Sequence, residues 1–295
     1  MPDTINTPPR LREDYYTSCM HGLDDIGWDY GCSFISYGTR LGERVSDPTL
    51  LDALQTKLPL DSNLTKERIV DRLFSVMTIN KNKTRMNRYN LYWDHTLFGK
   101  ELTLDEMLHR FDAIASLAVA ELSDEKLFVH AGVVDWQGVA ILIPGKSLSG
   151  KTTLVAELVK HGAKYYSDEF AVIDEEGYVM AYPKPLSIRE PGLLKQKDIP
   201  IQDLGGESGK SRLPVGLVVV SQYKKGAKWK PQILSPGLGL LSLLENTHSA
   251  RRSPDRAMQI LKQVANKALM IQSHRSEAYK VAPKILSEVS QVLKS

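Results

Sequence analysis

The chain has 295 residues, of which 42% are hydrophobic and 25% are charged, so it is long enough for one large globular domain or two smaller ones. A formal net charge of +3 argues against a nucleic-acid partner, and two widely spaced cysteines argue against a disulfide scaffold or a zinc cluster. A polar beginning and the lack of any run of about 18 apolar residues argue against a signal peptide and a membrane span, and predict a cytoplasmic protein.

The first 125 residues predict a small α+β domain. Residues 1–25 are polar and contain proline, so we expect a loose arm there. Thr103-Leu-Asp-Glu106 is a capping box, and the apolar residues after it repeat with a period of about 3.6, which predicts a buried helix as far as Leu122. The other elements expected in this part are strands at 32–37, 40–45, 69–78 and 88–93 and a helix at 48–57.

From residue 126 the pattern changes to short apolar runs that alternate with helices, which predicts an α/β domain with a mixed sheet. Ser235-Pro236 and Ser253-Pro254 each place a capping residue before a first-turn proline, so helices should begin there, and a last helix should reach about Leu293. Strands are expected at 127–134, 138–143, 163–166, 170–173, 178–182 and 214–222. We therefore divide the chain into domains 1–125 and 126–295, without assigning an oligomeric state; a homo-oligomer is compatible with this division.

A glycine-rich segment between an expected strand and an expected helix carries the clearest chemical signal. Two glycines let backbone N–H groups surround phosphate oxygens, and the helix N-terminus adds a positive dipole. In such a segment Lys151 would reach the outer phosphates and Thr152 would bind Mg²⁺. The sequence matches G-x-x-x-x-G-K-[ST] in full, and the predicted nucleotide-binding residues are Gly145, Lys146, Ser147, Leu148, Ser149, Gly150, Lys151, Thr152 and Thr153.

Three further polar residues lie close to this segment in the predicted topology. Asp168 and Glu169 follow an apolar strand, so one carboxylate could bind Mg²⁺ while the other accepts a proton from an attacking hydroxyl. The alternative is an ordinary acidic strand end. His130 lies in the strand that precedes the segment, where a structural histidine is the more common case.

The order and spacing of these motifs resemble those of the HPr kinase/phosphorylase family. The resemblance rests on His130-Ala-Gly-Val-Val-Asp135, on the glycine-rich segment and on Tyr166-Ser-Asp168-Glu169; it covers about residues 127–175, and nothing before residue 125 matches. It implies a fold similar to phosphoenolpyruvate carboxykinase and an ATP- and Mg²⁺-dependent kinase that phosphorylates a serine hydroxyl. It also implies that His130 belongs to the active site, that Asp168 is the base and that Glu169 is a metal ligand.

Two other positions carry over less directly. The family's Leu-Glu-Ile-Arg segment resembles Leu186-Ser187-Ile188-Arg189, so Arg189 would stabilise phosphoryl charge, but Ser187 replaces a Mg²⁺-binding Glu. The family's Arg-Pro-Gly-Arg turn resembles the segment around Arg252, which would be the catalytic Arg; a solvated surface residue is the alternative for both arginines. These departures put the family's reverse phosphorylase reaction in doubt.

The sequence thus predicts an ATP-dependent serine kinase whose acceptor is a protein, a peptide or a small molecule with a hydroxyl group. Two alternatives remain open: a nucleotide-binding regulatory module with little transfer activity, and a small-molecule kinase on the same scaffold. The domain before residue 125 is expected to recognise the acceptor or to mediate oligomerisation.

Overall fold

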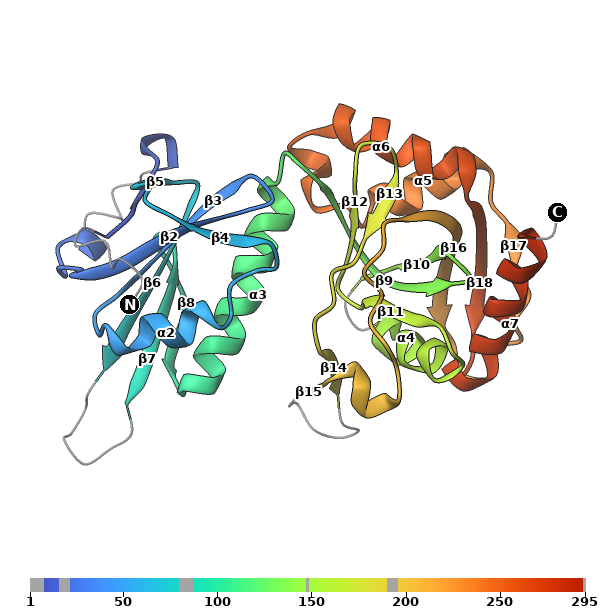
Figure 1. Cartoon of the computed structure of the whole chain (residues 1–295), viewed down its shortest axis with the longest axis horizontal. Helices are drawn as coiled ribbons and strands as arrows, with labels where there is room; N and C mark the ends of the chain where they lie inside the picture. Colours follow the sequence, from blue (N-terminus) through green and yellow to red (C-terminus); the bar gives the residue numbers. More distant parts are fainter. Residues whose placement is uncertain (1–7, 16–21, 80–86, 147–148, 190–195, 294–295) are drawn as a thin grey trace. The chain divides into compact units, whose positions relative to one another are not determined.

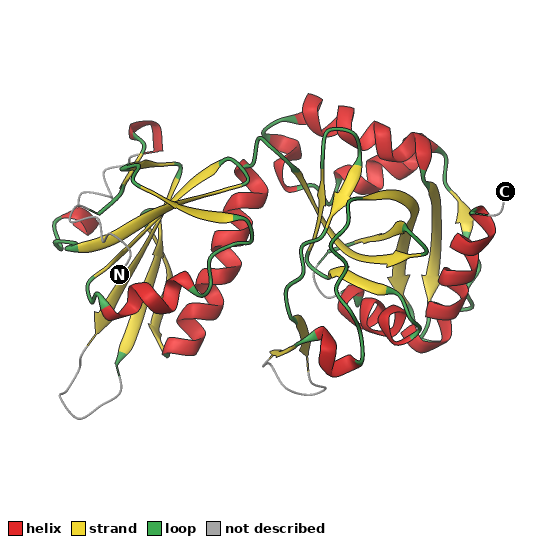
Figure 2. Cartoon of the chain, in the orientation of Figure 1, coloured by secondary structure: helices red, strands yellow, loops and turns green. Residues whose placement is uncertain are grey.

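A computed structural model describes residues 8–15, 22–79, 87–146, 149–189 and 196–293. The chain divides into two compact units, Met1–Glu125 and Lys126–Ser295. The division falls at the position at which the sequence analysis separates two domains. Both units combine helices with mixed β-sheets, so the protein is of the mixed α/β kind (Figures 1 and 2). Within the described residues, no helix combines the length and the apolar character that a membrane crossing requires.

The first unit is built on a six-stranded sheet of order β4-β2-β3-β6-β7-β8. Only the pairing of β3 with β6 is parallel. The strands are β2 (Tyr30–Ser36), β3 (Thr39–Val45), β4 (Ser62–Thr65), β6 (Arg72–Ile79), β7 (Arg88–Trp93) and β8 (Thr96–Leu102), with β1 (Arg10–Leu11) and β5 (Ile69–Val70) as a separate pair and η1 (Glu13–Tyr15) as a 3₁₀ turn.

The first unit also contains the helices α2 (Thr49–Gln55) and α3 (Leu104–Leu122) (Figure 1). The predicted capping box is present: the Thr103 side chain accepts from the Glu106 N–H while the Glu106 carboxylate accepts from the Thr103 N–H. Phe111 of α3 packs edge-on against Phe74 of β6, with ring centroids 5.5 Å apart. The sequence analysis missed β4 and β8, which are the two edge strands of the sheet.

The expectation of a loose arm over residues 1–25 is wrong for the part that the structure describes. Leu11 is buried with Val70 and Leu73, and β1 pairs in parallel with β5. A side chain at Gly42 would collide with the Pro9 ring, so this glycine leaves the space in which the segment packs. The polar composition and the prolines therefore gave the wrong prediction for the segment around Pro9 and Leu11, which packs on the sheet.

The second unit contains an eight-stranded mixed sheet. The pairings β10–β9, β9–β12, β12–β13, β13–β16 and β16–β10 close a ring, and β18 and β17 extend it beyond β16. Its strands are β9 (Leu127–Trp136), β10 (Val139–Pro144), β11 (Lys164–Ser167), β12 (Phe170–Ile173), β13 (Tyr178–Met180), β16 (Leu213–Tyr223), β17 (Gln232–Ile233) and β18 (Leu269–Arg275), with β14 (Leu186–Arg189) and β15 (Gln196–Ile199) as a separate hairpin.

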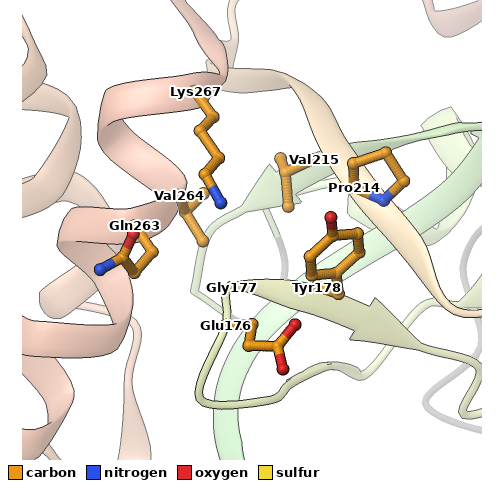
Figure 3. A pocket seen from close by; sticks show the side chains of 8 residues that line it. All are labelled: Glu176, Gly177, Tyr178, Pro214, Val215, Gln263, Val264 and Lys267. Atoms are coloured by element: carbon orange, nitrogen blue, oxygen red, sulfur yellow. The ribbon is translucent and has the colours of Figure 1, made fainter.

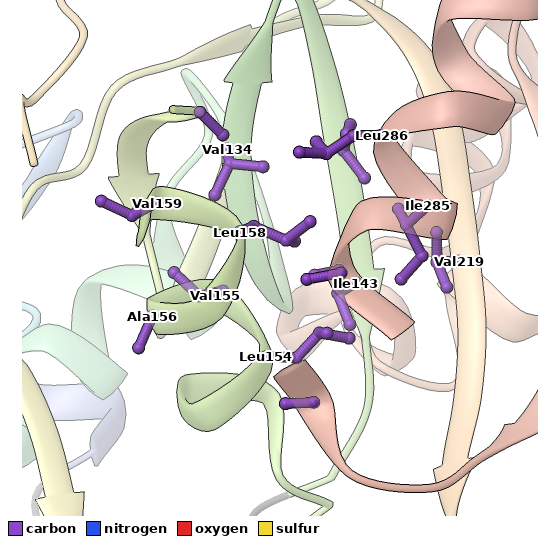
Figure 4. Packing of buried hydrophobic residues seen from close by; sticks show 14 of the residues in the cluster. Val134, Ile143, Leu154, Val155, Ala156, Leu158, Val159, Val219, Ile285 and Leu286 are labelled. Carbon is purple, nitrogen blue, oxygen red and sulfur yellow. The ribbon is translucent and has the colours of Figure 1, made fainter. Parts of the chain in front are cut away.

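Helices cover both faces of this sheet (Figure 2). Side chains alternate along β10. Ile141 and Ile143 belong to a buried cluster with residues of α4 (Lys151–Lys160) and α7 (Ala278–Val292), and Figure 4 shows Ile143 among them. Ala140 and Leu142 point to the opposite cluster, which contains α5 (Pro236–Leu244) and α6 (Pro254–Lys267). Because both faces of β10 are buried, its sequence is continuously apolar. Two 3₁₀ turns, η2 (Ile201–Leu204) and η3 (His248–Arg251), complete the unit.

The expected strands of this unit are present within a few residues of their predicted bounds, and the helices begin after Gly150, Ser235 and Ser253 as predicted. The strand β18 was missed, although it lies inside the sheet between β16 and β17. Its sequence follows the apolar stripe of α6 after a single residue, so the helical pattern obscured its start.

Candidate active site

The glycine-rich loop, residues 145–150, lies where several strands of the second unit end. The strands β10, β16 and β18 are parallel, so their carboxyl ends share one edge of the sheet. A loop at this edge that leads into a helix presents the first amides of that helix to a ligand. Ser147 and Leu148 lie outside the described residues, and the remaining loop residues connect β10 directly to α4.

Gly150 is the N-cap of α4 and has a φ of 82°, a left-handed conformation that favours glycine. The Gly145 N–H donates to the His130 carbonyl at 3.2 Å, and the Ser149 N–H donates to the Lys146 carbonyl at 3.2 Å. The first bond ties the start of the loop to β9, and the second joins the end of the loop to its second residue. Thr153 is exposed in the first turn of α4.

Lys151 is the first residue of α4 and is almost completely buried, with 7% of its surface exposed. Its Nζ donates to the carbonyls of Gly145 and Lys146 at 2.7 and 3.0 Å. Burial lowers the pKa of the ammonium group to about 8, although the charges of Asp168 and Glu169 act in the opposite direction. A buried cation is thus held against the loop.

The Asp168 carboxylate lies within reach of the start of α4. The Tyr165 hydroxyl donates to Oδ1 at 3.1 Å, and the Thr152 side chain and the Ser187 backbone lie near enough to lower the pKa of the carboxyl group. Burial raises the pKa of Asp168 above its ordinary value, while these groups partly offset that effect. The carboxylate is therefore both close to Thr152 and more basic than a solvated aspartate.

Glu169 is placed less deeply than its neighbour. It is half-buried, and its Oε2 lies 3.7 Å from Lys184 Nζ. The Glu169 N–H donates to the Ser167 hydroxyl at 3.2 Å, and the Glu169 carbonyl accepts from the Ala131 N–H. Its carboxylate is still near enough to favour the charged form of Lys151.

His130 lies beside a second histidine. Its ring centroid is 6.0 Å from that of His248, and both rings lie near Phe170. Burial, followed by the charges of Lys151 and His248, lowers the pKa of His130 to about 4. His130 is consequently neutral at physiological pH and can act there as a hydrogen-bonding group but not as a cation.

The two arginines that the resemblance singled out, Arg189 and Arg252, stay predictions. Arg189 is the last residue of β14, and its side chain lies outside the described part of the structure. Arg252 is the exposed residue at the end of η3. The nearby Arg256 is half-buried instead, and its Nη2 has no hydrogen-bond partner among the described residues.

One contact of the loop was not foreseen. Arg275, the last residue of β18, donates from Nη2 to the carbonyls of Ser149 and Gly150 at 3.0 and 2.9 Å. Nothing in the local sequence marks this residue, because the contact joins positions more than a hundred residues apart. A correct prediction of β18 would have placed Arg275 at the carboxyl end of a parallel strand, beside the loop.

The residues that the structure assembles have a donor set suited to a hard cation. The Thr152 hydroxyl and the Asp168 carboxylate supply adjacent oxygen atoms, and Mg²⁺ is commonly held by one or two protein oxygens together with substrate phosphates. Within the described residues, no group of three or more His, Cys, Asp or Glu side chains could hold a metal by itself. The arrangement therefore fits a cation that arrives with a phosphate ligand.

A small pocket elsewhere in the unit does not compete as an active site. It lies between Tyr178 of β13 and Lys267 of α6, and Figure 3 shows its lining. Its volume of about 10 Å³ suffices for one water molecule. Arg212 stacks on the outer side of Tyr178, with Cζ 3.9 Å from the ring centroid. The pocket includes none of the predicted site residues.

Comparisons with known proteins add little to this description. No protein-family model matches the sequence, and the comparison with curated proteins gives no significant match. Among solved structures, the chain has a distant likeness to the HPr(Ser) kinase/phosphatase from Coxiella burnetii, with 14% identity, coverage of 57% of this chain and 99% of that chain, and a TM-score of 0.31. A likeness at this TM-score carries no argument, so the case for a function rests on the residues.

Proposed function

We propose that the chain binds ATP at the glycine-rich loop and transfers its γ-phosphoryl group to a hydroxyl acceptor, a serine side chain in the first instance. The observation that carries this proposal is the buried ammonium group of Lys151, whose Nζ donates to two carbonyls of the glycine-rich loop while the charges of Asp168 and Glu169 favour its charged form. This arrangement supports an anion site, because a buried cation and the first amides of a helix both favour a bound phosphate.

In the proposed reaction each residue has a separate task. The loop and Lys151 bind the phosphates, and Asp168 accepts the proton of the acceptor hydroxyl. The acceptor oxygen forms a bond to the γ-phosphorus while the bond from that phosphorus to the β,γ-bridging oxygen breaks, and ADP leaves with the electron pair. Mg²⁺ held by Thr152 and Asp168, or by Glu169, would neutralise phosphate charge. Positioning and electrostatics account for most of the catalysis in such a site.

A regulatory module that binds nucleotide without transfer is the second candidate. It is favoured by Ser187, which stands where the resembling family has a carboxylate and whose backbone lies near Asp168. In this candidate the loop and Lys151 keep their roles, and Asp168 is only a metal ligand.

A single-turnover experiment separates these candidates. The protein is mixed with ATP labelled at the γ-phosphate and a cell extract, and the products are separated by size. Label in a polypeptide supports a protein or peptide acceptor, and label in a small organic molecule supports a small-molecule kinase. Label that stays in ATP or appears only as inorganic phosphate contradicts the kinase proposal. The Lys151→Ala variant is the control for contaminating kinases.

A further inference from the structure

Arg275 is an almost completely buried arginine that contacts the glycine-rich loop. It ends β18, only 3% of its surface is exposed, and Nη1 donates to the Ser276 carbonyl at 3.4 Å. Its Nη2 bonds two successive carbonyls of the glycine-rich loop, those of Ser149 and Gly150. A side chain on Gly150 would collide with this nitrogen, so the glycine also leaves the space that the guanidinium group occupies.

The geometry of the peptide group gives these two bonds a further consequence. A trans peptide is planar, and its C=O and N–H bonds point in opposite directions. Arg275 holds the Ser149 and Gly150 carbonyls, and the Gly150 carbonyl also accepts from the Leu154 N–H at 3.1 Å. The N–H groups of Gly150 and Lys151 therefore point away from Arg275. These N–H groups stand at the beginning of α4, where the first amides have no partner within the helix.

We propose that Arg275 is a positioning residue, which orients the Gly150 and Lys151 amides toward the phosphates of the nucleotide. The inference rests on the proposed function, since it names the group that prepares the loop for its ligand. A planar guanidinium with several fixed donors suits this task, because one nitrogen can serve both carbonyls while another anchors the side chain. Amides oriented before binding need no reorganisation when the anion arrives.

The competing explanation is that Arg275 merely ties β18 to α4 and stabilises the fold. The two explanations predict that a substitution of Arg275 changes different properties of the protein. A positioning residue affects the loop and its ligand, whereas a structural tie affects the stability of the whole unit. A test therefore has to measure both.

The experiment compares the wild-type chain with Arg275→Gln, Arg275→Lys and the matched control Arg212→Gln. Arg212 belongs to the same unit but pairs with Asp174 and Glu176. Affinity for fluorescently labelled ADP and hydrogen exchange of the ligand-free protein are measured, together with the midpoint of urea unfolding. We expect Arg275→Gln to weaken ADP binding about tenfold or more, Arg275→Lys to weaken it less, and Arg212→Gln to leave it within about twofold.

Hydrogen exchange gives the localised readout. Peptides that cover residues 149–154 should exchange faster in Arg275→Gln, whereas those from β12 and α6 should not change. Wild-type affinity and unchanged loop exchange in the folded Arg275 variants would overturn the inference, as would a loss of protection spread evenly over the unit. If Arg275→Gln does not fold, the comparison of Arg275→Lys with the wild type decides. If the wild type itself binds no ADP, the proposed function fails, and loop exchange alone decides whether Arg275 orders the loop.

Discussion

Lys151 is a cation in a place where charge is costly. Burial lowers its pKa to about 8, so the ammonium group begins to lose its proton only slightly above neutral pH. A bound phosphate stabilises the charged form, so the pKa of Lys151 should rise when nucleotide binds. Binding is then coupled to proton uptake by a single side chain.

This coupling predicts that nucleotide affinity falls as the pH rises through about 8 and is constant below it. The slope should approach a tenfold loss per pH unit, because one proton is taken up per nucleotide. The affinity for ADP is measured from neutral pH to about pH 9.5. The Lys151→Arg variant is the control: a guanidinium group does not titrate in this range, so its affinity should vary little. A wild-type affinity that does not change with pH would show that Lys151 does not contact the phosphates.

Asp168 allows a second prediction at this scale. If it accepts the proton of the acceptor, Asp168→Asn should reduce phosphoryl transfer by a factor of about 100 or more while changing the Kd for Mg-ATP much less. The asparagine keeps the size of the side chain and its capacity to accept from Thr152. Rate and affinity are measured separately, by single-turnover transfer and by calorimetry. Equal losses in both would make Asp168 a metal ligand and leave the base unassigned.

Among the secondary-structure elements, β3 of the first unit carries an unusual residue. Glu43 is fully buried, and Cys32 Sγ donates to its Oε1 at 2.9 Å, while Oε2 has no hydrogen-bond partner among the described residues. Burial raises the pKa of Glu43 from 4.5 to about 8. It also raises the pKa of the Cys32 thiol, which is consequently a poor nucleophile.

The folded chain therefore prefers Glu43 protonated. Because the pKa in the folded state exceeds that in the unfolded state, the contribution of Glu43 to stability is fully present below about pH 4.5 and is lost as the pH rises to about 8. The free energy of unfolding should fall by at most about 1.4 kcal/mol per pH unit in this window. Glu43→Gln, which stays neutral, should gain stability over the wild type as the pH rises.

Urea unfolding at a series of pH values measures this difference. Glu67→Gln is the control for the removal of an exposed carboxylate from the same unit. A constant difference between Glu43→Gln and the wild type across the window would show that Glu43 titrates normally.

The secondary-structure elements also show which parts of the fold can be predicted from the sequence. The capping box at Thr103 and the apolar runs of β9 and β10 were readable because they are local features of the sequence. The edge strand β8 was missed because most of its residues are exposed and show no apolar period, although its partner β7 directly precedes it. The strand β18 was missed because it follows α6 closely and its partner β16 lies far away in the chain. Pro9 and Leu11 were misjudged because the glycine at position 42 that makes room for Pro9 belongs to another element.

The residues of the candidate site likewise fall into those that sequence motifs identified and those that they missed. The glycine-rich loop, His130, Thr152 and the acidic pair were identified from short motifs, and the structure brings Thr152 and Asp168 together. Their roles stay predictions. Arg275 was not identified because its contact with the loop joins distant elements of the chain. Arg256 was not identified because its burial also arises only when distant elements pack.

For the whole molecule, the division into two compact units raises the question of what the first unit does. All residues assigned to the proposed chemistry lie in Lys126–Ser295, so the first unit would select the acceptor. A chain shortened to residues 126–295 should bind Mg-ATP within about twofold of the full chain and lose about tenfold or more in kcat/KM for the acceptor found by labelling. The full-length chain purified in parallel is the reference. Unchanged kcat/KM would exclude a role in selection, and a changed oligomeric state would assign the first unit to assembly.

The central claim is that the loop at 145–150 and Lys151 bind a nucleoside triphosphate with Mg²⁺. Calorimetric titration of the full chain with ATP, with and without Mg²⁺, tests it most directly, with Lys151→Ala as the matched variant. We predict one site per chain, tighter binding in the presence of Mg²⁺, and a loss of at least about tenfold in affinity for Lys151→Ala at unchanged thermal stability. No heat of binding for the wild type, or equal affinity in both proteins, would contradict the claim.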